Sequence, residues 1–249
     1  MDIDIIDEEG KKGNITAIHE RTNQLLRPAV SNVDQAVVIF AVTKPAPNTN
    51  LLDRFLVFME REQVPTLICF NKSDLADDKE LEELRRTYEN SGCRVIFTSA
   101  RDEKGLSELQ SLLEGKVSTV AGPSGVGKSS LINLLQSGVS METGEISKKI
   151  ERGKHTTRHS QLIPIKDDTY IMDTPGFSTL YLENFEKEDL KEYYNEFQEY
   201  FRDCRFMGCN HMSEPDCAVK QAVENGDIPK VRYENYRTLF EELSQVKKY

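Results

Sequence analysis

Apolar runs alternate with amphipathic stretches through the middle of this chain. Residues 37–42 form a continuous apolar run, which is typical of a strand buried on both faces of a parallel sheet. Between such runs, apolar residues recur every three or four positions, as they do along one face of a helix. The alternation predicts an α/β fold with a mostly parallel sheet and helices on both faces. We expect further strands at 64–70, 94–98, 117–121, 161–165 and 169–173, and helices at about 52–59, 77–91, 106–113 and 127–136.

The two ends of the chain have a different pattern. Isoleucines flank a polar, glycine-containing stretch at 9–13, which predicts a β-hairpin that is either docked on the main domain or left from a larger β domain. From about residue 183 the apolar spacing becomes helical. We therefore predict three parts: a short β segment at 1–28, an α/β domain at 29–180 and a small helical domain at 181–249.

Composition narrows the class of protein. The chain has 249 residues, of which 38% are hydrophobic and 30% charged, as in a folded soluble protein. Its formal net charge of −10 argues against a general nucleic-acid coat but not against a local basic site. No apolar run approaches the roughly 20 residues of a membrane helix, and the first residues do not resemble a signal peptide. We therefore expect a cytoplasmic protein with no membrane partner and, with five cysteines, no disulfides.

A phosphate-binding loop is predicted at residues 122–129, which read as a glycine, four residues and then Gly-Lys-Ser. An apolar strand leads into it and a helical pattern follows, which is the context that such a loop requires. Glycines let backbone N–H groups face phosphate oxygens. Lys128 is expected to reach the β- and γ-phosphates, and the Ser129 hydroxyl to bind Mg²⁺. The expected nucleotide contacts are Gly122, Pro123, Ser124, Gly125, Val126, Gly127, Lys128, Ser129 and Ser130.

Residues 71–74, which read Asn-Lys-Ser-Asp, predict guanine specificity. The Asp74 carboxylate can accept hydrogen bonds from the N1–H and 2-amino groups of guanine, and adenine lacks both donors. Asn71 is expected to hold the loop and to approach N7, while the stem of Lys72 covers one face of the base. Such residues also occur in many ordinary turns, so the prediction of guanine specificity depends on a second segment as well.

The second segment is Ser-Ala-Arg at 99–101, directly after another predicted strand. Ser99 and Ala100 are expected to line the same base, with a backbone N–H near Ala100 donating to the guanine 6-oxo group.

Two further segments predict the γ-phosphate and Mg²⁺ contacts. The tetrapeptide Asp-Thr-Pro-Gly at 173–176 follows a strand, and an Asp at a strand end is where phosphate-loop proteins hold Mg²⁺. Asp173 is therefore a predicted Mg²⁺ ligand, and the N–H of Gly176 is expected to meet the γ-phosphate. Either Thr156 or Thr157 can add a hydroxyl to the same ion. An ordinary Pro-Gly turn is the alternative for the tetrapeptide alone.

Residue 177 is Phe, at a position where many GTPases have the Gln that orients the attacking water. A phenyl ring cannot hold a water molecule by hydrogen bonds. We therefore expect a slow intrinsic rate, and His155 is the candidate residue for positioning the water.

A zinc site is predicted in the C-terminal part. Three cysteines and one histidine lie within fourteen positions, a ligand set that matches Cys₃His zinc sites. Four protein ligands leave no open coordination position, so the metal is expected to be structural and to stabilise a small helical domain. The predicted ligands are Cys204, Cys209, His211 and Cys217.

The order of these motifs indicates a circular permutation, because the guanine segments precede the phosphate loop. This order, together with the Cys-x₄-Cys-x-His-x₅-Cys cluster, resembles the ribosome small subunit-dependent GTPase A family of bacteria over residues 14–245. The resemblance implies a GTPase that acts late in maturation of the small ribosomal subunit, binds its rRNA and is stimulated by it. It also implies an N-terminal OB-fold, of which 1–28 is a shortened remnant, and it selects Thr157 rather than Thr156 as the Mg²⁺ ligand.

Three functions remain as hypotheses. The first is a Mg²⁺-dependent GTPase switch with Lys128, Thr157 and His155 as the catalytic residues. The second is an RNA- or ribosome-binding scaffold that binds GTP and hardly hydrolyses it, which Phe177 favours. The third is a phosphate-loop kinase, which the guanine segment at 71–74 opposes. For the first we expect a monomer with GTP or GDP, Mg²⁺ and one structural Zn²⁺, and the small ribosomal subunit with its rRNA as partner.

Overall fold

A six-stranded sheet forms the centre of the molecule in a computed structural model that describes residues 2–5, 13–25, 30–136, 161–173, 180, 182 and 185–245. The strand order is β7-β6-β5-β8-β10-β9. Neighbouring strands are parallel, except that β9 and β10 pair antiparallel. The predicted, mostly parallel sheet is therefore confirmed. The strands are β5 (Gln35–Ala41), β6 (Thr66–Asn71), β7 (Arg94–Phe97), β8 (Val117–Ala121), β9 (Gln161–Lys166) and β10 (Thr169–Asp173).

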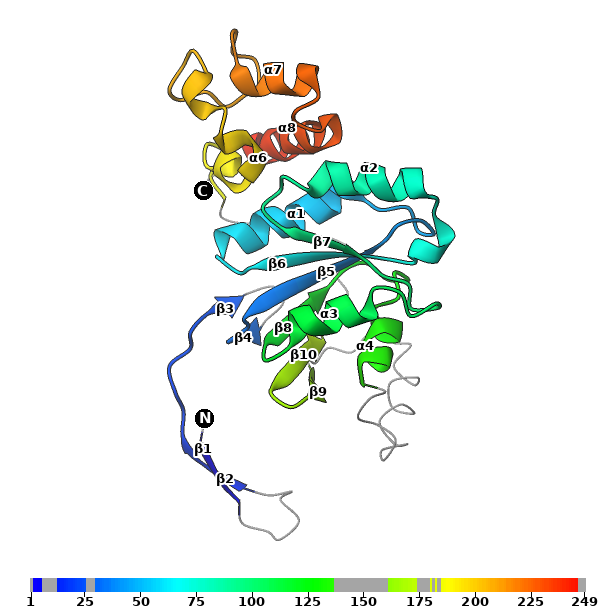
Figure 1. Ribbon diagram of the computed structural model, residues 1–249. Coiled ribbons are helices and arrows are strands. Elements are labelled where there is room, and N and C mark those ends of the chain that lie inside the picture. Colours follow the sequence, from blue (N-terminus) through cyan, green and yellow to red (C-terminus); the bar gives the residue numbers. More distant parts are fainter. Residues whose placement is uncertain are drawn as a thin grey trace.

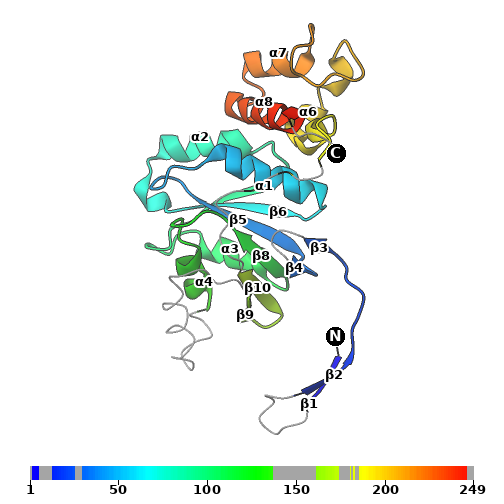
Figure 2. The ribbon, with the colours of Figure 1, turned by 180° about the vertical axis from the view of Figure 1, so that it is seen from behind.

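Helices cover both faces of the sheet, as predicted (Figure 1). Alternate side chains of a strand point to opposite faces, so β5 contributes to two cores. Val38 and Phe40 pack with α1 (Thr49–Arg61) and α2 (Asp78–Tyr88). Val37 and Ile39 pack on the other face with α3 (Leu106–Leu113) and α4 (Lys128–Gln136). Figure 2 shows the same two layers from behind.

Two antiparallel strand pairs precede the sheet. The first, β1 (Asp2–Ile5) with β2 (Gly13–Ala17), is the predicted hairpin. It lies apart from the sheet in Figure 1, and Ile15 is 59% exposed, so its described strands are not docked on the main domain. The second, β3 (Gln24–Leu25) with β4 (Val30–Ser31), is held to the end of α1 by the buried Leu25 and Val30.

The C-terminal part is helical, but its first portion is less regular than the sequence suggests. The apolar spacing over 190–201 is that of one helix face, yet the chain forms three short turns. Tyr194 interrupts them because its backbone is extended, with φ −109° and ψ 91°. Two longer helices follow. The turns are η2 (Leu190–Tyr193), α6 (Asn195–Gln198) and η3 (Phe201–Asp203), and the helices are α7 (Ala218–Asn225) and α8 (Lys230–Gln245).

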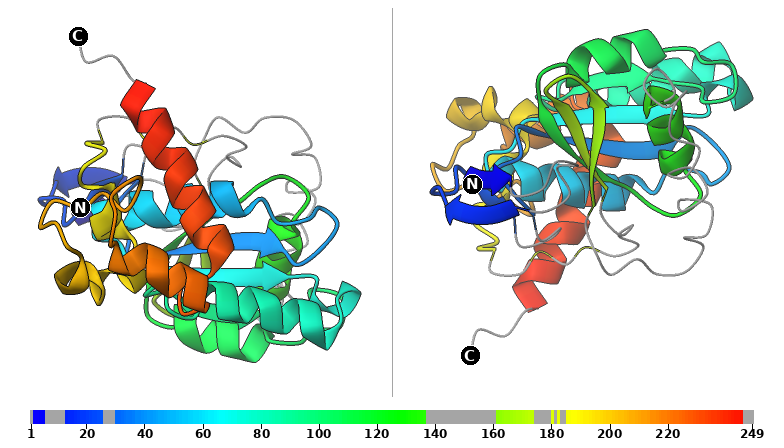
Figure 3. Two further views of the ribbon diagram at one scale, coloured as in Figure 1. Left: turned by 90° about the horizontal axis from the view of Figure 1, so that it is seen from above. Right: turned by 90° about the horizontal axis from the view of Figure 1, so that it is seen from below.

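Helix α1 connects the two regions. Its Leu52 and Phe55 face the sheet, whereas Val57 belongs to the C-terminal core. Helix α8 crosses α1, as the view from above in Figure 3 shows. An ion pair reinforces this contact, because Arg54 of α1 donates to Glu242 of α8. Arg54 also donates to the carbonyl of Leu180 at 3.3 Å.

Candidate active site and metal centre

The predicted nucleotide-binding residues lie at one edge of the sheet. Strands β6, β7, β8 and β10 run parallel, so their carboxyl ends point the same way. Asn71, Gly122 and Asp173 stand at or just beyond the ends of three of these strands, and Ser99 follows the fourth. In open α/β sheets, ligands bind in the crevice outside these ends.

The phosphate loop connects β8 to α4 as predicted. All three of its glycines have a positive φ, which favours glycine, with values of +145° at Gly122, +80° at Gly125 and +95° at Gly127. A Cβ on Gly122 would lie 2.1 Å from the carbonyl oxygen of Ile39, and one on Gly127 would lie 2.3 Å from Nδ2 of Asn71. Gly122 and Gly127 therefore need to be glycine for the loop to pass this close to β5 and to the last residue of β6.

Lys128, the first residue of α4, turns its ammonium group back into this loop. Its Nζ donates to the carbonyls of Gly122 at 2.8 Å and Pro123 at 2.7 Å. Burial lowers the pKa of Lys128, and the negative charge of Asp173 opposes that shift. An ammonium group in this position is partly dehydrated and held near the loop, which suits it to bind phosphate.

The other predicted loop residues differ in exposure. Val126 is buried in the core beside α4. Ser124, Gly125, Ser129 and Ser130 are exposed, which leaves them accessible to a ligand.

The guanine segment is hydrogen-bonded to the phosphate loop. Asn71 donates from Nδ2 to the carbonyl of Val126 at 2.8 Å. Lys72 has a left-handed backbone (φ 63°), and its Nζ donates to the carbonyls of Gly125 and Lys44, both at 2.7 Å. This second role of the lysine is not evident from the sequence. These two hydrogen bonds connect the guanine segment to the phosphate loop and to the loop before α1.

The two guanine segments also contact each other. Ser99 donates from Oγ to the Asp74 carboxylate at 2.7 Å, which orients the predicted base-binding group. The backbone N–H of Ala100, which we expected to face the guanine 6-oxo group, donates here to Oδ1 of Asn71 at 3.2 Å. The structure thus brings Asn71, Lys72, Asp74, Ser99 and Ala100 together.

Several predicted residues lie outside the described residues. They are His155, Thr156, Thr157, Gly176 and Phe177. Their assignments stay predictions.

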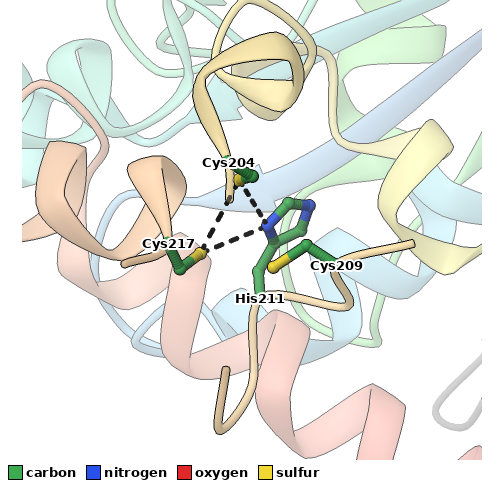
Figure 4. A group of neighbouring side chains, drawn as sticks. All are labelled: Cys204, Cys209, His211 and Cys217. Atoms are coloured by element: carbon green, nitrogen blue, oxygen red, sulfur yellow. Dashed lines mark hydrogen bonds between the residues drawn. The ribbon is translucent and has the colours of Figure 1, made fainter. Parts of the chain in front are cut away.

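The predicted metal ligands form one cluster, drawn in Figure 4. The ligand atoms of Cys204, Cys209, His211 and Cys217 all lie within 4.8 Å of one another. Nδ1 of His211 is 3.4 Å from Sγ of Cys217 and 3.7 Å from Sγ of Cys204, and those two sulfurs are 4.0 Å apart. A tetrahedral site with Zn–S of about 2.3 Å has sulfurs about 3.8 Å apart, so the donor set fits zinc.

Burial favours the uncharged forms of the ligand side chains in this cluster. Burial raises the pKa of Cys217 to about 12 and raises that of Cys209, and it lowers the pKa of His211 to about 4. Such surroundings penalise bare thiolates, which a bound divalent cation would stabilise.

Side chains that the sequence analysis missed hold the backbone of this metal loop. The Glu214 carboxylate accepts from the N–H groups of Asn210 and Met212, both at 2.8 Å. Tyr233 donates to the carbonyl of His211 at 2.7 Å, and Tyr236 to that of Asn210 at 2.6 Å. The two tyrosines belong to α8, so this helix supports the metal loop directly.

A buried ion cluster was also missed. Arg232 of α8 donates to Asp53 of α1 and, at 2.6 Å, to Glu196 of α6. All three side chains are buried. A signal was present in the sequence, because Arg232 shares the helix face of the apolar residues 236, 239 and 243.

The fold is that of a circularly permuted GTPase. A phosphate loop lies at the ends of its parallel strands, and the Asn-Lys-Ser-Asp segment comes earlier in the chain. The profile of the RsgA GTPase family matches residues 18–183. A small ribosomal subunit biogenesis GTPase RsgA from Agathobacter rectalis is 59% identical over 249 residues, which is 100% of this chain and 82% of that protein. This chain belongs to the RsgA GTPase family and is a GTPase, as the resemblance implied.

Solved structures agree with this assignment. YjeQ from Thermotoga maritima gives a TM-score of 0.78 at 39% identity, covering 96% of this chain and 82% of that chain. YloQ, described as a circularly permuted GTPase, gives 0.75 at 35% identity, with 98% and 79% covered. The predicted permutation is therefore confirmed. Among the described residues, no helix has both the length and the apolar character to cross a membrane.

Proposed function

We propose that this GTPase acts as a Mg²⁺-dependent switch in late maturation of the small ribosomal subunit, and that binding the subunit stimulates its turnover. The observation that carries the proposal is the direct contact between the guanine segment and the phosphate loop, through Asn71 to Val126 and Lys72 to Gly125. The relatives named as small ribosomal subunit biogenesis GTPases supply the cellular context.

In this proposal the nucleotide lies across the ends of β6, β7 and β8. Asp74 accepts from guanine, and its hydrogen bond with Ser99 keeps the carboxylate in place. Lys128 gives up its bonds to two loop carbonyls and turns to the phosphates, where its charge offsets the charge that develops during hydrolysis. Proposed Mg²⁺ ligands are Ser129, Asp173 and Thr157, and Gly176 is the proposed γ-phosphate contact.

Bound Mg²⁺ would neutralise phosphate charge, and water would be the nucleophile. The position after Gly176 is Phe177, which cannot orient that water. We therefore assign this role to His155 or to the bound subunit. A slow intrinsic rate with strong stimulation follows from this arrangement.

The C-terminal cluster is proposed to hold one structural zinc ion. Its four protein donors would fill a tetrahedral shell, so the metal supports the fold and takes no part in hydrolysis. The same proposal includes domain boundaries at residues 28 and 180 and an OB-like origin of the N-terminal segment. It also includes a monomeric state and a cytoplasmic location with rRNA as partner.

The test is GTP turnover with and without isolated small ribosomal subunits, at matched nucleotide and Mg²⁺ concentrations. The proposal expects slow hydrolysis alone and a large rise with subunits. A control with large subunits should show no comparable rise. Binding to small subunits without stimulation would favour the scaffold hypothesis instead.

A further inference from the structure

Two of the predicted zinc ligands, Cys209 and His211, lie on one short stretch of backbone that a single carboxylate holds. Oε1 of Glu214 accepts from the N–H of Asn210 and Oε2 from the N–H of Met212, both at 2.8 Å. Glu214 is not one of the four clustered donors. It therefore acts on the ligands through the backbone that carries them.

The backbone at His211 needs such support. Its φ of 57° lies in the left-handed region, which residues with a Cβ seldom adopt. A left-handed residue in a turn brings neighbouring N–H groups to one side of the chain, where they can bind an anion. The Glu214 carboxylate lies at this position and accepts on both sides of His211, so it favours the left-handed conformation. That conformation sets the direction in which the imidazole leaves the chain.

Three further side chains hold carbonyl groups of residues 209–211, each by one hydrogen bond. They are Lys191 of η2 and Tyr233 and Tyr236 of α8. Glu214 differs from them because it makes two bonds at once, and these bonds span His211. Both are charge-assisted, and such hydrogen bonds are roughly twice as strong as neutral ones. Removing this one side chain should therefore loosen the stretch more than removing either tyrosine hydroxyl.

We propose that Glu214 is a positioning residue for the metal. It fixes the backbone of residues 209–212 so that the Cys209 sulfur and the His211 imidazole meet the other two cysteines at one point. Substitution of Glu214 should then weaken zinc binding while the ligand set stays the same. This inference rests on the structural zinc ion proposed above.

The experiment measures how strongly the full chain retains zinc in competition with a chelator of known affinity. Glu214→Ala removes both accepted bonds, and Glu214→Gln keeps one oxygen as an acceptor. Asp216→Asn is the matched control. Asp216 also lies among the metal ligands and also has a left-handed backbone (φ 53°), but its carboxylate pairs with the exposed Arg205. This control removes the same charge without releasing the two N–H groups, and GDP binding shows in each variant that the GTPase domain is folded.

Glu214→Ala should lower the zinc affinity by about 10- to 100-fold, and Glu214→Gln by less. Asp216→Asn should stay within about threefold of the unsubstituted protein. Cobalt-substituted protein should show the same tetrahedral Cys₃His absorption spectrum in every variant, because the donors are unchanged. Hydrogen exchange gives a local readout. With zinc bound, the N–H groups of Asn210 and Met212 should lose protection in Glu214→Ala while α7 and α8 keep theirs.

Unsubstituted zinc affinity in Glu214→Ala would overturn the inference, and so would an equal loss in Asp216→Asn. A changed cobalt spectrum in Glu214→Ala would also overturn it, because Glu214 would then be a ligand itself. An unsubstituted protein that holds no zinc would instead refute the proposed metal site. Should Glu214→Ala not fold, Glu214→Gln decides by the same criteria: weaker zinc binding with an unchanged spectrum supports the role, and unsubstituted affinity contradicts it.

Discussion

Arg232 of α8 donates a hydrogen bond to Asp53 of α1, and neither side chain is exposed to solvent. Glu196 accepts from the same guanidinium, and Asn235 donates to the second oxygen of Asp53 at 2.8 Å. The centroid of the Tyr194 ring lies 4.6 Å from the guanidinium carbon. Buried charges are tolerated only when they are paired in this way. The cluster thus fixes the C-terminal helices to α1, and so to the sheet.

Removing the arginine should be costly. Arg232→Met leaves two carboxylates buried without their cation, so we expect a loss of about 3–5 kcal/mol in the free energy of unfolding. The measurement is chemical denaturation at pH 7. Arg237→Met is the control, since Arg237 lies on the same helix in an exposed ion pair and should change little. Equal stability of the two variants would contradict this account.

The same cluster predicts a pH dependence. Burial raises the pKa of Asp53 to about 6, although Arg232 opposes the shift. The folded state therefore binds this proton more tightly than the unfolded chain does. The corresponding stability is present at low pH and is lost as the pH rises through 6. Relative to Asp53→Asn, the unsubstituted protein should gain roughly 1 kcal/mol between pH 7 and pH 5. If the stabilities of the two proteins change in parallel with pH, the raised pKa of Asp53 is refuted.

Zinc should be measurable directly. We expect about one equivalent of zinc in the purified protein, and a loss of that metal in Cys209→Ala with lower stability of residues 185–245. Cys93→Ala is the control, because Cys93 lies outside the cluster. Elemental analysis and hydrogen exchange give the two readouts. An unsubstituted protein without zinc would remove the metal assignment.

Asp74→Asn should relax base specificity. The amide places a donor where guanine also presents donors, so the discrimination of GDP over ADP should fall at least about tenfold. Asp78→Asn, a neighbouring exposed carboxylate on α2, should keep that discrimination. Competition binding with both nucleotides measures the ratio. Unchanged discrimination in Asp74→Asn would refute the assignment of this carboxylate.

The meeting of residues 71–74 with the phosphate loop was predictable from the sequence. Both follow apolar strands, and the ends of parallel strands lie at one edge of a sheet. The metal cluster was predictable for another reason, because its ligands lie close together in the chain. Both predictions needed only local patterns and one rule of topology.

The ion cluster was not predictable in this way. Asp53 and Arg232 are 179 positions apart, and the sequence around either residue does not indicate that the two form an ion pair. Such contacts depend on how distant elements pack, which hydrophobic periodicity does not specify.

GTP should be hydrolysed at the loop between β8 and α4, and substitution of Lys128 tests this. GTP turnover should be measured for Lys128→Ala with saturating small ribosomal subunits, beside Lys166→Ala, which removes an exposed lysine of β9. We expect Lys128→Ala to lose about 100-fold or more in turnover, while Lys166→Ala remains active. Turnover of Lys128→Ala at the unsubstituted rate would contradict it.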